Sequence, residues 1–112
     1  MIKDITTSIS LDSGSSTTIF SYQVPAQSKA YLKKFGQLIS DFSAVGSVIW
    51  QIQRNGNPVY PYENIKEIIG NAYQPIDTQN IEFQGGDLLS VVITNNYTTS
   101  LNVGIRIVFE VI

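Results

Sequence analysis

Apolar and polar residues alternate with a period of two through most of the chain, and the alternation is clearest near its C-terminal end. The apolar residues there occupy the odd positions Leu101, Val103, Ile105, Ile107, Phe109 and Val111, with Asn102, Arg106 and Glu110 between them. Successive side chains of a strand point to opposite faces of the sheet, so this pattern predicts a strand with one buried face. A shift of one residue would expose the whole apolar set, which makes the register strongly specified.

The same alternation recurs in earlier segments. The inward sets are Phe20, Tyr22 and Val24, then Val48, Trp50 and Ile52, then Leu89, Val91 and Ile93. Near the N-terminus Ile5, Ile9 and Leu11 fit a further strand, followed by a flexible loop over 12–16. From 30 to 39 we predict a strand without choosing its buried face, because two phases compete there, and Gly36 suits a bulge. The residues expected in the core are Phe20, Trp50, Ile52, Val91, Ile93, Val103, Ile105, Ile107 and Phe109.

Turn signals lie between these segments. Asn55-Gly56 can adopt the positive φ angles of a type I′ hairpin turn. Gly85-Gly86-Asp87 and Asn95-Asn96 bracket the strand predicted over 88–94. One helical signal occurs, in which Asn64 would cap a single short turn over 65–69.

About eight short strands and almost no helix signal predict an all-β fold, an antiparallel β-sandwich that is jelly-roll-like. With 112 residues the chain has the length of one domain, spanning 1–112. Within it, 1–16 is interpreted as a flexible or partner-contacting N-terminal segment.

Charge and composition narrow the function classes. The net charge is −2 and only 14% of residues are charged, whereas Ser, Thr, Asn and Gln make up about a third of the chain. Because nucleic-acid affinity depends on clustered Lys and Arg, we expect no nucleic-acid partner. No segment approaches the ~18 apolar residues of a membrane span, and none near the start resembles a signal peptide. We therefore expect no membrane partner and folding in a cytoplasm.

The chain has few parts from which an enzyme could be built. It contains no His and no Cys, which excludes Ser-His-Asp and Cys-His nucleophilic sites and histidine or thiolate zinc sites. The carboxylates Asp77, Glu82 and Asp87 are candidates for acid–base work, against the simpler interpretation as loop caps. We predict no enzyme, no catalytic residue, no cofactor and no metal site.

Aromatic and outward-facing apolar residues are candidates for an interface. Trp50 is in phase with Val48 and Ile52, which favours the core over a sugar-stacking platform. Tyr60, Tyr62 and Tyr73 lie in a Pro-containing stretch, where contact surface and simple loop packing are both open. Ile49, Val108 and Ile112 are predicted to face outward and to join this tyrosine stretch in one patch. Such a patch would favour a homo-oligomer.

Several motifs together resemble the small β-sandwich virion proteins of tailed bacteriophages, of the head-decoration, head-fibre or capsid-surface type. The motifs are Val24-Pro25-Ala26, the hairpin from Trp50 to Val59, the segment from Phe83 to Leu89 and the final strand. The resemblance implies a non-enzymatic structural protein, commonly a trimer, which decorates or stabilises the capsid surface or serves as a compact knob of a fibre. Its expected location is the virion, after synthesis in the host cytoplasm.

The partners implied by this resemblance are the major capsid protein or other virion proteins. The turn with Arg54, Asn55 and Asn57, or the N-terminal segment, is then the expected contact with the shell. A carbohydrate-binding β-sandwich module is the alternative function, with a cell-surface glycan as partner.

Overall fold

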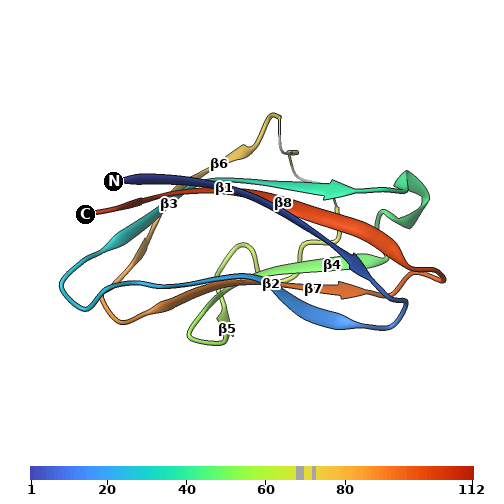
Figure 1. The fold of residues 1–112 in the computed structure, drawn as a ribbon, viewed down its shortest axis with the longest axis horizontal. Helices are drawn as coiled ribbons and strands as arrows, with labels where there is room; N and C mark the ends of the chain where they lie inside the picture. The colour runs from blue at the N-terminus through green and yellow to red at the C-terminus, as the bar shows by residue number, and fades with distance from the viewer. Residues whose placement is uncertain (68–69, 72) are drawn as a thin grey trace.

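The computed structural model describes residues 1–67, 70–71 and 73–112, and it confirms the all-β sandwich (Figure 1). The strands are β1 (Ile2–Leu11), β2 (Ser16–Gln23), β3 (Ala30–Ile39), β4 (Val48–Arg54), β5 (Asn57–Pro58), β6 (Ile76–Phe83), β7 (Leu88–Asn95) and β8 (Leu101–Val111). They form two four-stranded antiparallel sheets, called sheet A with the order β1-β8-β3-β6 and sheet B with the order β2-β7-β4-β5.

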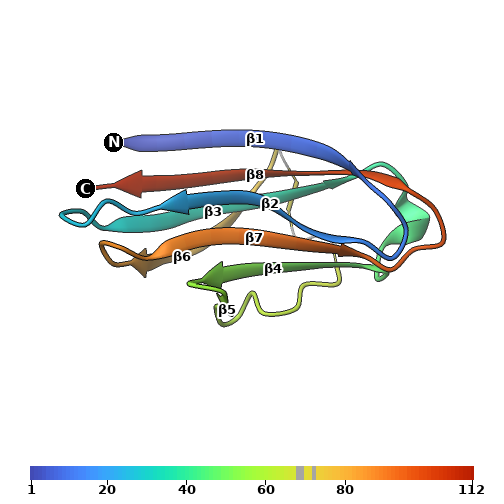
Figure 2. The same cartoon turned by 60° about the horizontal axis from the view of Figure 1, so that its bottom comes forward.

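The strand pairing is nested, which is the topology of a jelly roll. The first strand pairs with the last, β2 with β7, β3 with β6 and β4 with β5. A long hairpin folded over on itself produces this arrangement, with successive strands crossing between the sheets. Figure 2 shows the two chain ends side by side at one end of the sandwich, with β1 at its outer margin.

The core lies between the sheets and consists largely of the residues that the alternation predicts. All of the expected core residues are buried except Phe20, which is half-buried. β2 is an edge strand of sheet B, and its other inward residues Thr17 and Tyr22 are half-buried as well. The Phe20 and Tyr22 rings still pack on Phe109, with centroids 5.9 Å and 4.9 Å away.

A bulge in β3 explains why its sequence shows two phases. Ala30 and Leu32 face the core from even positions, whereas Phe35 and Gln37 face it from odd positions. The register shifts between Leu32 and Lys34 on both neighbouring strands. The predicted bulge at Gly36 is therefore wrong. An extra residue at position 33 lets two consecutive lysines both avoid the core, which a regular strand could not do.

The turns follow the sequence signals, but the helical turn does not. Asn55 and Gly56 have φ angles of 52° and 82°, which confirms the type I′ hairpin turn. Ile65 forms an extended bridge to Trp50, so no helical turn begins at Asn64; Ile68 and Ile69 lie outside the described residues. The helical turn of the described residues is a 3-10 turn at Phe42–Ala44, capped by Asp41. None of the described residues forms a helix suited to crossing a membrane.

Candidate functional site

The outer face of sheet B carries no charged residue along three neighbouring strands. Outward positions alternate with the buried ones, and the register aligns them in rows across the sheet. They are Ser16, Thr18, Ser21 and Gln23 of β2, Leu88, Ser90, Val92 and Thr94 of β7, and Ile49, Gln51 and Gln53 of β4. Ser90 occupies an outward position of the central strand but is covered by its neighbours and is only 5% exposed. Some of these side chains bond to one another. The Ser16 and Thr94 hydroxyls, on neighbouring strands, are 2.9 Å apart, and along β4 the Gln53 amide donates to the side-chain oxygen of Gln51 over 2.9 Å. We call this set the uncharged face.

The outer face of sheet A is charged by contrast. Arg106 forms a two-pronged ion pair with Asp4, with N–O distances of 2.9 Å and 2.7 Å. Lys33 lies 3.5 Å from Glu110, and Lys29 lies 3.6 Å from Glu82. The guanidinium of Arg106 holds the pKa of Asp4 below its usual range. The two broad faces of the sandwich therefore differ in chemistry, although both are accessible to solvent.

This difference makes the uncharged face the candidate interaction surface. Charged residues are depleted at the cores of protein interfaces, because ions must lose their water when they are covered. Hydroxyls, amides and aliphatic side chains can be covered at less cost when their hydrogen bonds are kept. The sequence pattern alone could not reveal the surface, since it separates inward from outward residues without assigning each strand to a sheet.

The predicted patch of outward apolar residues does not form. Ile49 lies on the uncharged face of sheet B, whereas Val108 lies on the outer face of sheet A. Ile112, 69% exposed, follows β8 at the end of sheet A, where its backbone pairs with Lys29. A sandwich has two outer faces that point apart, so outward residues of different strands need not meet.

The three tyrosines also separate. Tyr60 is 82% exposed directly after β5 of sheet B, and Tyr73 is 88% exposed beside β3 of sheet A. Tyr62 is half-buried, and its carbonyl accepts a hydrogen bond from the Ile52 N–H of β4. Burial raises the pKa of the Tyr62 hydroxyl, and the carboxylate of Asp77 raises it further. Tyr62 is thus a packing residue, while Tyr60 and Tyr73 are free for contact on different sides.

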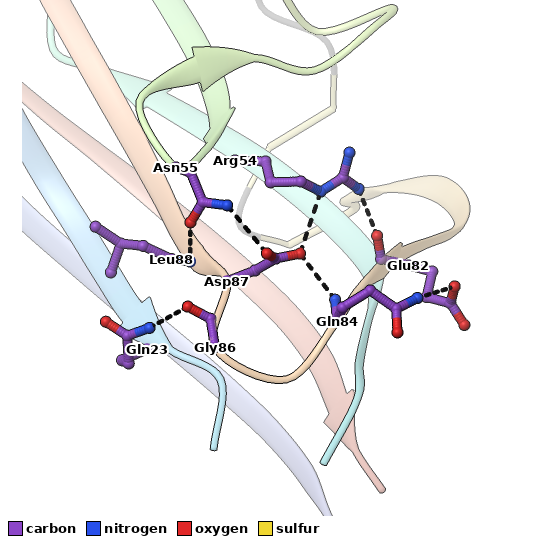
Figure 3. A network of polar contacts seen from close by, with 8 residues as sticks. All are labelled: Gln23, Arg54, Asn55, Glu82, Gln84, Gly86, Asp87 and Leu88. Carbon is purple, nitrogen blue, oxygen red and sulfur yellow. Dashed lines mark hydrogen bonds and ion pairs between the residues drawn. The ribbon is translucent and has the colours of Figure 1, made fainter. Parts of the chain in front are cut away.

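The turn between β4 and β5, a predicted contact with the capsid, is bonded to the turn between β6 and β7 (Figure 3). Asn55 donates to the Asp87 carboxylate over 3.0 Å and accepts from the Leu88 N–H over 2.8 Å. Asp87 also accepts from the Gln84 N–H over 2.9 Å and lies 3.6 Å from Arg54. These contacts link the β4–β5 turn to the β6–β7 turn. Asn57 is exposed, and it lies opposite Arg54 in the backbone pairing of β4 with β5.

The carboxylates considered for acid–base work have structural bonds. Asp87 caps the β6–β7 turn, and Asp77 accepts from the Gln79 N–H over 2.7 Å. Glu82 accepts from the Tyr31 hydroxyl over 3.0 Å, a bond that raises the pKa of Tyr31. No group of three or more carboxylates gathers as a metal site among the described residues.

We expect the free energy of unfolding of Asp87→Asn to fall less than that of the wild type when the pH is lowered. The Asn55 amide, the Gln84 N–H and the charge of Arg54 lower the pKa of Asp87 in the folded state. A lowered folded-state pKa adds stability above the unfolded-state value, and this stability is lost as the pH falls through the folded-state value. Urea unfolding at pH about 7 and about 2.5 should show a difference between wild type and variant that shrinks in acid.

The variant Asn55→Ala removes the main donor and should reproduce part of this effect. Both variants keep Asp4, so its own acid dependence cancels in the comparison. An equal stability difference at the two pH values would show that the Asp87 carboxylate is not stabilised by the network.

A separate hollow of about 300 Å³ lies beside β3 on the sheet A side. It is lined by Gln37, Leu38, Ile39, Phe42, Asn71 and Tyr73, none of which is charged. Phe42 is 80% exposed and follows the strand in the 3-10 turn, so two accessible aromatic rings border the hollow. Tyr73 is a candidate from the sequence, but Phe42 is not, because a lone aromatic residue after an apolar strand gives no distinguishing signal in the sequence.

No model of a known protein family matches the chain. A search of curated proteins finds no match either.

Proposed function

We propose that this domain is a non-enzymatic structural protein of a bacteriophage particle, which decorates or stabilises the capsid surface or forms a compact knob of a fibre. The observation that carries the proposal is the uncharged face of sheet B, opposite a charged face on sheet A. The resemblance in the hairpin from Trp50 to Val59 and in the final strand supports the same function class.

The uncharged face suits contact with a flat protein surface. The molecule measures 44 × 26 × 22 Å, so a face along its long axis is large enough for the ~800 Å² that each partner of a standard interface buries. The residues of the uncharged face carry no charge of their own to desolvate, whereas covering the outer face of sheet A would desolvate the Asp4–Arg106 and Lys33–Glu110 pairs. The domain would therefore lie with sheet B on the particle and sheet A toward solvent.

The proposal predicts that the chain is present in purified particles at a fixed ratio to the major capsid protein, as measured by quantitative mass spectrometry. Particles that lack the chain should bind the purified domain. Val92→Lys should weaken this binding at least about tenfold, because it places a charge in the middle of the covered face. Val108→Lys is the matched control, since it makes the same change at a half-buried valine in the middle of sheet A.

Absence of the chain from particles would refute the proposal. Equal binding by the Val92 and Val108 variants would retain a particle protein but reject the uncharged face as its contact. A homo-oligomer is a separate prediction, for which the resemblance favours three copies.

A carbohydrate-binding function is the second candidate, and the hollow beside β3 favours it. Sugar C–H groups stack on the electron-rich faces of aromatic rings, which Phe42 and Tyr73 offer, and amides such as Asn71 bond hydroxyls. A volume of about 300 Å³ is at the small end of ligand sites and suits one sugar unit. On a glycan array, binding that disappears in Phe42→Ala and Tyr73→Ala but persists in Tyr60→Ala would support this candidate.

A further inference from the structure

The free edge of sheet A at β1 is long and regular. All ten residues from Ile2 to Leu11 pair with β8 without a register shift. The strand contains no Pro and no Gly, and sheet A has no neighbour beyond it among the described residues (Figure 2). An edge of this kind is a template for pairing with another strand, and proteins usually protect it.

The backbone groups that point away from β8 can be identified from the bonding at the strand's start. The Val111 N–H donates to the Met1 carbonyl over 2.8 Å, and the Met1 amine donates back over 2.7 Å. Bonding alternates along an antiparallel strand, so odd residues of β1 bond to β8 and even residues present their N–H and C=O groups outward. The even residues Ile2, Asp4, Thr6, Ser8 and Ser10 are all exposed.

The other sheet edges are protected in ways that β1 is not. In β6, Gln79 and Asn80 have positive φ angles of 58° and 56°, which disrupt its outer edge. The β2 edge carries the shift between Thr18 and Phe20. At the fourth edge β5 has two residues, and the following chain bonds to β4 through Tyr62 and Ile65. Bulges, short strands and covering segments are common protections of sheet edges.

The charges of β1 are already engaged within its own chain. The Lys3 ammonium lies 5.6 Å from the centre of the Tyr22 ring, and Asp4 pairs with Arg106. A charge on an edge strand normally discourages pairing, but a charge that is neutralised by its own chain does so less. The β1 edge is therefore competent for strand addition.

We infer that β1 is a self-association edge, at which a second copy of this chain adds its own β1 antiparallel across a twofold axis. With Thr6 opposite its own copy, Asp4 lies opposite Ser8 and Ile2 opposite Ser10, so no like charges meet. The two A sheets become one continuous eight-stranded sheet. The axis is perpendicular to that sheet, so both uncharged faces lie on the same side of the dimer. The inference goes beyond the proposed function and applies equally to a carbohydrate-binding domain. It predicts two copies, where the resemblance implies three.

Light scattering after size-exclusion chromatography at tens of micromolar should give twice the 12.4 kDa monomer mass. Thr6→Pro removes an outward N–H but none of the bonds to β8, and should weaken the dimer at least about tenfold while the β-type circular dichroism persists. Thr6→Ala is the matched control, because it removes the side chain and keeps the N–H, and it should dimerise like wild type. A monomeric or trimeric wild type, or equal dimerisation of the Pro and Ala variants, would overturn the inference.

A cysteine variant tests the register without depending on how Pro is tolerated. The chain has no native Cys, so Thr6→Cys adds a single thiol. Across the twofold axis the two Cα atoms would be about 5.5 Å apart, a spacing that a disulfide can bridge. Mild oxidation should link Thr6→Cys at least about tenfold faster than Ser10→Cys, which would face Ile2 of the other copy. Equal rates would reject this register. Particle binding is measured separately with Val92→Lys, so dimerisation through β1 and particle binding through the uncharged face can each be rejected independently.

Discussion

Truncation of Trp50 to alanine should lower the free energy of unfolding by about 3–5 kcal/mol, the usual cost of removing a large buried aromatic side chain. Trp50 is 1% exposed, and its backbone also bonds to Ile65 through an N–H and a C=O. The cavity would lie between the sheets, where neighbouring side chains can close it only in part. Because the total stability of such a domain is about 5–15 kcal/mol, the variant should be close to unfolding.

Denaturant unfolding followed by far-ultraviolet circular dichroism measures this effect, since the variant has lost the chain's single Trp as a fluorescence probe. Gln51→Ala is the control on the adjacent outward position and should change stability by less than about 1 kcal/mol. A Trp50 variant that unfolds like wild type would show that this side chain does not lie between the sheets.

The strands and the core could be predicted because hydrophobic alternation reports local geometry. In β8 the odd positions are apolar throughout, and in β4 the even positions are apolar from Val48 to Ile52. These apolar residues, from Val48 to Ile52 and from Leu101 to Phe109, are buried. The Asn55-Gly56 turn could also be predicted, because few residue pairs other than Asn-Gly adopt two successive positive φ angles at low cost.

The buried face of β3 and the structure around Ile65 could not be predicted from hydrophobic alternation. A bulge at Lys33 moves the inward set from even to odd positions, so a single period fails along the strand. The apolar spacing after Asn64 predicts a helical turn, but the backbone of Ile65 pairs with Trp50 of β4. A local pattern does not contain this contact, because the two residues are 15 positions apart in the sequence.

The candidate surface could be predicted least of all. Val108 and Ile49 look equivalent in sequence, since each alternates with buried residues, yet they lie on opposite faces. Only the nested pairing of strands separates a charged face from an uncharged one and places β1 at an open edge. The candidate surfaces of this domain therefore follow from its topology and not from a local motif.

Asn95→Ala should cost about 2–4 kcal/mol, because a buried backbone group that loses its partner costs about 1–3 kcal/mol. The sequence suggested only a turn residue, but Asn95 is fully buried at the end of β7. Its side-chain NH₂ group donates to the backbone carbonyls of Leu11 and Thr99 over 3.0 Å and 3.1 Å. Its side-chain oxygen accepts from the Tyr97 N–H over 2.8 Å. The side chain thus joins the end of β1 to the loop before β8.

Asn96→Ala is the matched control, because Asn96 is exposed and its N–H bond to the Ser47 carbonyl survives the change. We expect it to alter stability by less than about 0.5 kcal/mol. Amide hydrogen exchange should locate the effect, since Tyr97 loses the acceptor of its N–H in the Asn95 variant and should exchange faster there, while Ile93 in the middle of β7 should change only with global stability. Equal stability of the two variants would mean that the Asn95 bonds are replaced by water at no cost, and the loop would then be held by packing of the half-buried Tyr97 ring.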